Sequence, residues 1–200
     1  MILDRILGKI LLPFRPAARL AVRLKRTYRV TVFRRKDHKT IEVCGARMPR
    51  PETDVNIDCL DAPEVDIVHV LPEKLPFDDH TIDHIISSAT LEHFNIHDIR
   101  RILQDFYRIL KPGGEIAISM PGLHKILARY QKTGATDELL RYLHGGQKDN
   151  YDIHLCVLDA ERLMQEIRRC GFGNIQEVEY DADPHAPEYM LKIIALKSCL

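Results

Sequence analysis

The stretch from Leu75 to Ser119 constrains the fold most, because its pattern specifies a strand, a long helix and a second strand in succession. Asp83–Ser87 contains two adjacent isoleucines in a run of the length of a buried strand. Asn95–Leu110 carries apolar residues three and four positions apart, which places them on one face of a helix. Lys-Pro-Gly-Gly at 111–114 ends that helix, since proline cannot continue it and glycine accepts a left-handed turn. Glu115–Ser119 is the next expected strand, and a unit of this length predicts two parallel strands.

The same stretch carries a family resemblance. LPFDDHTIDHIISSATLEHF, followed by ILKPGGEIAIS, resembles the second half of class I S-adenosylmethionine-dependent methyltransferases, and in particular the small type 11 group. The resemblance extends from Ile41 to Lys197. It implies an α/β class I methyltransferase (Rossmann-like) fold, with a seven-stranded sheet in the order 3-2-1-4-5-7-6 and an antiparallel last strand. It also implies S-adenosylmethionine as the cofactor.

Apolar runs, helical periodicity and turn residues predict the remaining elements. The further strands expected are Thr40–Cys44, Asp54–Asp58, Val65–His69, Asn174–Tyr180 and Tyr189–Lys197. The further helices of the domain expected are Leu123–Tyr130, Asp137–Leu143 and Ala160–Cys170. Only the short loop Gly45–Thr53 separates the first two strands, so we expect the first helix of the doubly wound unit to be reduced or absent.

Charge is distributed unevenly, although the net charge of the whole chain is zero. Residues 1–40 contain 12 Lys or Arg and 2 Asp, a net charge of +10. The remaining chain contains 17 basic and 27 acidic side chains, a net charge of −10. We therefore divide the chain into a basic amphipathic N-terminal arm, residues 1–39, and a methyltransferase-like domain, residues 40–200. Such an arm indicates an anionic partner, which the acidic domain itself could also be.

The arm is amphipathic in two segments, which predict extra N-terminal helices. Met1–Leu12 and Ala17–Tyr28 each place apolar residues on one face and charged residues on the other, and Thr27–Phe33 is expected as a short edge strand. Two basic amphipathic helices are typical of an interfacial anchor, so residues 1–28 are a candidate for binding an anionic membrane surface. The alternative is that their apolar faces cap the sheet or a partner subunit. Nucleic-acid binding is disfavoured, because exposed aromatic residues are not interleaved with the cations.

Composition excludes other classes of protein. The cysteines form no Cys-x-x-Cys pair, so neither a disulfide framework nor a cysteine zinc site is indicated. No apolar run approaches the roughly 20 residues that span a bilayer, and the N-terminus lacks the pattern of a signal peptide. We expect a cytoplasmic protein, with peripheral attachment to a membrane if the arm binds lipid. The oligomeric state stays open.

The cofactor-binding residues are expected at the carboxyl ends of the strands. Within the resemblance, Asp58 stands where an acid binds both ribose hydroxyls; the alternative is a turn-forming Asp. Cys44, Gly45 and Ala46 correspond to the glycine-rich turn, of which only Gly45 is a glycine. A Cβ at the two other positions could crowd the cofactor. Val70 also replaces the family's usual adenine-binding Asp.

These departures leave two hypotheses for function. The first is an active S-adenosylmethionine-dependent methyltransferase that also uses backbone groups near Leu71 and Ser88, and that methylates a small molecule such as a saccharide or a lipid-linked intermediate. The second is a pseudo-methyltransferase that keeps the fold and acts as a binding or scaffold protein. We favour the enzyme. The chain has no G-x-G-x-x-G motif after the first strand, which argues against a dinucleotide-binding enzyme.

Two histidines are candidate catalytic bases, His93 and His154, which match histidines of the related group. Methyl transfer is a single displacement, and a base is needed only when the acceptor must lose a proton. A structural role is the alternative for His93. His93 and His97 have the spacing of two metal ligands on a helix, but no third ligand follows at a suitable spacing, so no metal is expected.

Overall fold

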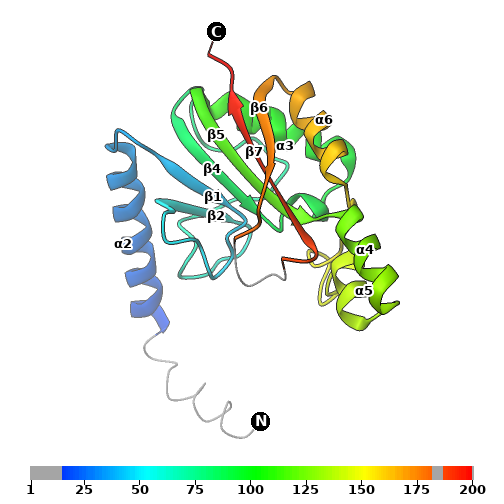
Figure 1. Cartoon of the computed structure of the whole chain (residues 1–200). Coiled ribbons are helices and arrows are strands. Elements are labelled where there is room, and N and C mark those ends of the chain that lie inside the picture. The colour runs from blue at the N-terminus through cyan, green and yellow to red at the C-terminus, as the bar shows by residue number, and fades with distance from the viewer. Residues whose placement is uncertain (1–14, 182–186, 200) are drawn as a thin grey trace, which may run out of the picture.

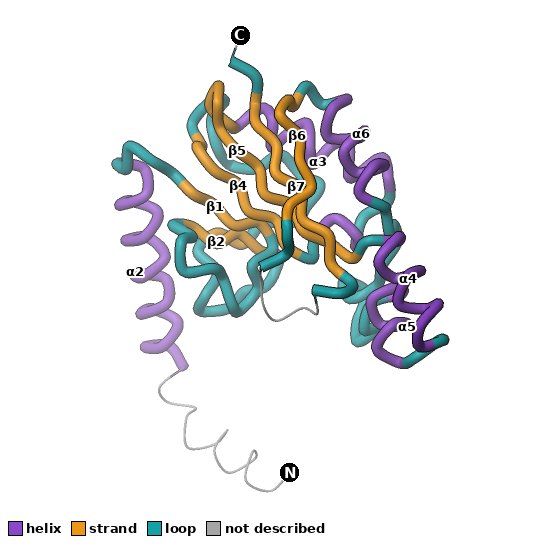
Figure 2. The backbone as a smooth tube through the Cα atoms, in the orientation of Figure 1, coloured by secondary structure: helices purple, strands orange, loops and turns teal. Residues whose placement is uncertain are grey.

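The computed structural model describes residues 15–181 and 187–199, which are built around one seven-stranded sheet (Figures 1 and 2). The strand order is β3-β2-β1-β4-β5-β7-β6. β7 runs antiparallel to both neighbours, and the other neighbouring strands pair in parallel. The predicted sheet order and the antiparallel last strand are confirmed. The strands are β1 (Thr40–Val43), β2 (Val55–Asp58), β3 (Ile67–Val68), β4 (Ile82–Ser88), β5 (Leu110–Pro121), β6 (Phe172–Val178) and β7 (Met190–Lys197).

The helices lie mainly on one side of this sheet. α3 and α6 cover one face, α4 and α5 lie together beyond the end of β5, and α2 stands beside the β1–β2 edge of the molecule (Figure 1). The helices described are α2 (Arg15–Arg34), the 3-10 turn η2 (Leu91–His93), α3 (Ile96–Ile109), α4 (Leu123–Thr133), α5 (Asp137–His144) and α6 (Ala160–Arg169). The three predicted helices after α3 are therefore present within a few residues of their expected bounds.

The central β4–α3–β5 unit forms as its local pattern predicts. The side chain of Asn95 caps α3 by accepting hydrogen bonds from the backbone N–H groups of His97, at 2.9 Å, and Asp98, at 3.1 Å. The apolar stripe of α3 is buried against the sheet. Gly113 has a φ of 79° in the first part of β5, where the pairing with β4 shifts its register. β5 starts earlier than expected, because its pairing with β4 already begins at Leu110.

The two faces of the central strands differ in polarity. Ile41 belongs to the apolar core, whereas Glu42, the next residue, points to the opposite face of the sheet. No helix connects β1 to β2, as predicted, and the loop 44–54 covers Glu42 instead. The Glu42 carboxylate accepts hydrogen bonds from the backbone N–H of Arg50, at 2.6 Å, and the hydroxyl of Thr53, at 2.8 Å. The buried Glu42 carboxylate thus provides hydrogen-bond acceptors for polar groups of the loop that packs on the sheet.

The predicted edge strand Thr27–Phe33 is wrong, because α2 continues through this segment. Arg26 donates to the carbonyl oxygen of Val65, at 2.6 Å. Arg29 donates to the carbonyl oxygen of Asp54, at 2.7 Å. These contacts hold one face of the helix against the loops that begin β2 and β3. Tertiary contacts of this kind override the β-propensity of a short segment.

α2 also contributes to the core of the domain. Phe33 is 4% exposed, and its ring centroid lies 5.9 Å from that of Phe77. The expected helix Ala17–Tyr28 is part of α2, whereas the expected helix Met1–Leu12 lies outside the described residues. Among the helices of the described ranges, none combines the length and the apolar character that a membrane span requires.

Candidate active site

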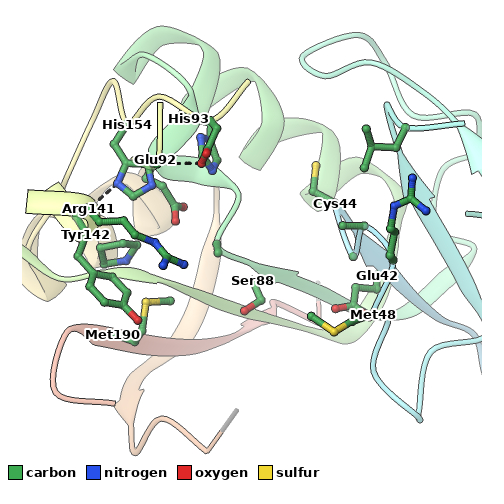
Figure 3. Close-up of a pocket in the computed structure, with 18 of the residues that line it drawn as sticks. Glu42, Cys44, Met48, Ser88, Glu92, His93, Arg141, Tyr142, His154 and Met190 are labelled. Carbon is green, nitrogen blue, oxygen red and sulfur yellow. Dashed lines mark hydrogen bonds between the residues drawn. The ribbon is translucent and has the colours of Figure 1, made fainter. Parts of the chain in front are cut away.

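A pocket of about 410 Å³ opens where β1 and β4 end. This is the edge of an open α/β sheet at which ligands bind. Figure 3 shows Glu42 and Cys44 at one end of the pocket, His93 and His154 at the other, and Ser88 between them. We call the first the turn end (Glu42, Cys44, Gly45 and Ala46) and the second the histidine end (Glu92, His93 and His154).

The turn end keeps a backbone that suits glycine. Cys44 has a φ of 62° and Ala46 a φ of 48°, both in the left-handed region. In that region, a residue other than glycine is destabilised by about 1–2 kcal/mol. At Gly45 an added Cβ would lie 2.6 Å from Oδ1 of Asn56, so no larger residue fits. The turn therefore retains its shape even though two of its three positions have side chains.

Asp58 closes this turn from the end of β2. One carboxylate oxygen accepts a hydrogen bond from the backbone N–H of Ala46, and the other accepts one from the backbone N–H of Leu60, both at 2.9 Å. The side chain is 5% exposed and is not among the residues that line the pocket. These bonds are those of a turn-forming Asp. A carboxylate has about four acceptor sites, so two are left for a ligand.

Burial changes the pKa of Glu42, the acidic residue of the turn end. Glu42 is 3% exposed, and loss of hydration raises the pKa of its carboxyl group, which the hydrogen bonds from Arg50 and Thr53 partly offset. The neighbouring Cys44 thiol also has a raised pKa because it is buried. It is therefore a neutral packing group rather than a reactive thiolate.

At the histidine end, the rings of His93 and His154 meet edge to face, with their centroids 4.9 Å apart. Nδ1 of His93 lies 3.1 Å from the carbonyl oxygen of Ile153, and Nδ1 of His154 lies 2.8 Å from that of Tyr142. A carbonyl oxygen can only accept, so each Nδ1 carries a hydrogen atom. Burial lowers the pKa of both imidazoles, which favours their neutral forms.

Glu92 completes the histidine end. Its side chain is fully buried, and neither carboxylate oxygen has a hydrogen-bond partner. Burial raises the pKa of this carboxyl group to about 8. The backbone carbonyl of Glu92 accepts hydrogen bonds from the N–H groups of Leu155, at 2.7 Å, and Cys156, at 3.1 Å. Those two bonds hold the segment that carries His154 against η2, which carries His93.

The family model described as "Methyltransferase domain", of type 11, matches residues 22–118. An S-adenosylmethionine-dependent methyltransferase of Thermotoga maritima superimposes with a TM-score of 0.56 over 98% of this chain and 99% of that chain, at 16% identity. Another, from Methanosarcina mazei, superimposes with a TM-score of 0.53 over 84% and 96%, also at 16% identity. The chain has the class I methyltransferase fold. This fold accounts for the sheet order and the antiparallel β7.

Relatives with assigned activities match only part of this chain. The demethylmenaquinone methyltransferase of Listeria welshimeri is 30% identical over 76 residues, which are 35% of this chain and 31% of that protein. The chain thus spans about a third of the length of this relative. The match supports similarity to methyltransferases. The substrate in its name describes the relative and is not carried over to this chain.

The match to the methyltransferase family model implies S-adenosylmethionine as the cofactor. This cofactor is cationic at its sulfonium and its ammonium group, and two buried carboxyl groups, those of Glu42 and Glu92, line the pocket. Asp58 retains acceptor sites beside the turn for hydroxyl groups. Burial raises the pKa of both carboxyl groups, and a cation beside them would favour their ionised forms. The residues present therefore fit the cationic groups and the hydroxyl groups of the cofactor.

Most of the residues predicted for the site meet in this pocket. Those that line it are Cys44, Gly45, Ala46, Ser88, His93 and His154. Asp58 closes the turn from outside the lining, and Leu71 packs against the main core, so their contacts with a cofactor stay predictions. Sequence reasoning missed the roles of Glu42 and Glu92. Each is an acid within or beside an apolar segment, which hints at burial, but only the packed structure shows them facing a pocket.

Proposed function

We propose that the protein is an S-adenosylmethionine-dependent methyltransferase that acts on a small molecule. The observation that carries this proposal is the single pocket that joins the turn end to the histidine end across Ser88 (Figure 3). When bound, the cofactor supplies an electrophilic methyl group. The protein contributes mainly by holding two reactants in line, which is the dominant requirement of a displacement reaction.

The turn end is the proposed cofactor site. Cys44, Gly45 and Ala46 line the pocket, and Glu42 places an acid beside them for the cationic part of the cofactor. Asp58 is proposed to accept hydrogen bonds from the ribose hydroxyls with the acceptor sites that the turn leaves open. Leu71 and Ser88 are proposed to contribute backbone contacts.

The histidine end is the proposed acceptor site. The neutral rings of His93 and His154 each have Nδ1 bound to a backbone carbonyl, which leaves Nε2 as the basic atom of the ring. An Nε2 atom that faces the acceptor can take the proton of a hydroxyl group as its oxygen is methylated. A hydroxylated acceptor, such as a saccharide or the head group of a lipid-linked intermediate, suits this end.

α2 supports an acceptor at a membrane surface. Leu20, Leu24 and Tyr28 are four residues apart and are 57%, 61% and 70% exposed, so they form an apolar stripe along the outer face of the helix. Arg19 and Arg23 are exposed beside it. An apolar stripe flanked by cations suits the interface of an anionic bilayer. Lipid-linked substrates would be found there.

Isothermal titration of the full chain with S-adenosylmethionine and S-adenosylhomocysteine tests the proposed activity at its first step. We expect one binding site per chain with a Kd below about 1 mM, the upper end of ordinary substrate affinities. Asp58→Ala should weaken binding about tenfold or more, because it removes charge-assisted hydrogen bonds. Asp61→Ala is the matched control, since Asp61 lies in the same loop and is exposed.

Each outcome has a distinct meaning. If the intact protein releases no heat and is not stabilised against thermal unfolding at millimolar cofactor, the enzyme hypothesis is wrong and the scaffold protein remains. If Asp58→Ala and Asp61→Ala bind equally well, while circular dichroism shows both folded, Asp58 does not bind the ribose.

A further inference from the structure

The histidine end has the composition of a metal site. Glu92, His93 and His154 each offer a ligand atom, and these three atoms lie within 4.8 Å of one another. We propose that Glu92, His93 and His154 bind a divalent transition-metal ion such as Zn²⁺. From the sequence alone no metal is expected, because only His93 and His97 were considered and no third ligand was found near them. His97 lies exposed on the first turn of α3. The third ligand comes from a segment distant in the chain.

The Glu92 carboxyl group is the strongest indication of a missing partner. It is fully buried, and both of its oxygens lack a hydrogen-bond donor. Buried polar groups in native proteins are nearly always satisfied, and a buried charge without a counter-ion is strongly unfavourable. A bound cation would satisfy the carboxylate directly.

The two histidines are oriented as metal ligands usually are. Backbone carbonyls hold Nδ1 of each ring, from Ile153 at 3.1 Å and from Tyr142 at 2.8 Å. Metal-bound histidines commonly donate their second N–H to a carbonyl or a carboxylate, which sets the tautomer and leaves the other nitrogen for the ion. The bond to Tyr142 therefore leaves a lone pair on Nε2 of His154. The ring of His93 also has a hydrogen bond with the backbone of Ala89, which a bound ion would replace.

The backbone that carries the ligands is also tied together. The carbonyl oxygen of Glu92 accepts hydrogen bonds from Leu155 and Cys156, and the N–H of His154 donates to the carbonyl oxygen of His144, at 3.1 Å. Zn–N bonds are about 2.0–2.1 Å long, so binding would draw the three side chains closer than they now lie. The backbone hydrogen bonds keep the two ligand-bearing segments together while the side chains adjust.

The ligand set limits the kind of ion and its role. Two imidazoles and one carboxylate suit zinc, iron, cobalt or nickel rather than magnesium or calcium, which prefer all-oxygen sites. Three protein ligands leave a coordination position open, as in catalytic rather than structural zinc sites. A hydroxyl oxygen of the acceptor would take that position, and its proton would pass to solvent more readily because the ion lowers its pKa.

This role for the ion rests on the proposed function, whereas the metal site itself does not. With the ion bound, His93 and His154 are ligands and no longer accept the proton of the acceptor. Binding of Zn²⁺ and binding of S-adenosylmethionine are thus separate measurements, and either can fail without the other.

The test is metal binding by the full chain after treatment with EDTA and dialysis. We expect one Zn²⁺ per chain in competition with a chromophoric chelator. Co²⁺ should give visible d–d absorption without the thiolate charge-transfer band that ligation by one of the cysteines would add. His93→Ala and His154→Ala should each weaken Zn²⁺ binding by about 100-fold or more, since losing even a group behind a ligand costs about 10–100-fold. Glu92→Gln should also weaken it, because a carboxamide is a poor ligand.

His97→Ala is the matched control and should bind Zn²⁺ like the original chain. Substoichiometric Zn²⁺, a thiolate band in the Co²⁺ spectrum, or equal losses in all four variants would overturn the metal site. If a variant does not fold by circular dichroism, the stoichiometry and the Co²⁺ spectrum of the original chain decide the question. If the metal-free protein binds S-adenosylmethionine but no Zn²⁺, only the metal site fails.

Discussion

Cys44 and Ala46 hold a left-handed backbone that glycine adopts without steric cost, with φ of 62° and 48°. The divergent motif therefore keeps the path of the turn and accepts the strain of two Cβ atoms. Strain of this kind persists only where the surroundings enforce it. Here the Asp58 carboxylate enforces it by binding the backbone N–H of Ala46.

Ala46→Gly is expected to stabilise the protein by about 1 kcal/mol, because it removes the left-handed penalty of an alanine, net of the greater freedom of glycine in the unfolded chain. Equilibrium unfolding in urea measures this as a higher midpoint at an unchanged slope. Ala128→Gly is the matched control. Ala128 is exposed in the middle of α4, where the same substitution should destabilise by about 1 kcal/mol. If both substitutions destabilise equally, Ala46 is not strained.

At the scale of the element, α2 has two faces with different partners. Arg26 and Arg29 bind backbone carbonyls of the domain on one face, and Leu20, Leu24 and Tyr28 are exposed on the other. A helix on the surface of a domain normally exposes polar residues on its outer face. Packing of α2 on the domain therefore does not explain the exposed apolar stripe of Leu20, Leu24 and Tyr28.

Leu24→Glu is expected to abolish or strongly reduce co-sedimentation with vesicles that contain phosphatidylserine, because it places a charge in the apolar stripe. Leu127→Glu is the matched control, since Leu127 is 53% exposed on α4. Binding of the original chain should also fall as salt is raised, because salt screens the flanking cations. If Leu24→Glu sediments like the original chain, the stripe of α2 does not bind lipid.

For the molecule as a whole, we predict a boundary at residue 39 between the N-terminal arm and the domain. The packing of α2 against the domain is relevant to that boundary. Phe33 belongs to α2, within the arm, yet it is buried in the main core beside Phe77. The basic residues of α2 also pair with acids of the domain, as Arg29 does with Asp66 at 2.9 Å. α2 thus contributes to the stability of the domain as well as to its surface.

Phe33→Ala is expected to lower the free energy of unfolding by about 3–5 kcal/mol, the usual loss for a large aromatic residue in a core. Val32→Ala is the matched control, because the adjacent Val32 is exposed. Urea unfolding of both variants separates the alternatives. A loss below about 1 kcal/mol for Phe33→Ala would mean that α2 is attached to the domain only weakly, as an independent arm would be.

Local sequence patterns were enough to predict the β4–α3–β5 unit, and the family resemblance was enough to predict the sheet order. The unit is local: its apolar stripe, the Asn95 cap and the positive φ of Gly113 act over a few residues, so their pattern predicts their structure. The edge strand expected at Thr27–Phe33 failed for the converse reason. Propensity alone favoured a strand there, whereas contacts of Arg26 and Arg29 with distant loops hold a helix.

The assembly of the candidate site depends on contacts between distant segments. His93 and His154 were singled out separately, but the hydrogen bonds between η2 and the segment 153–156 bring them together and place the buried Glu92 beside them. The same holds for Asp58, two of whose acceptor sites are taken by the backbone N–H groups of Ala46 and Leu60. Burial and long-range hydrogen bonds depend on which distant segments pack together, and no local pattern of side chains encodes that.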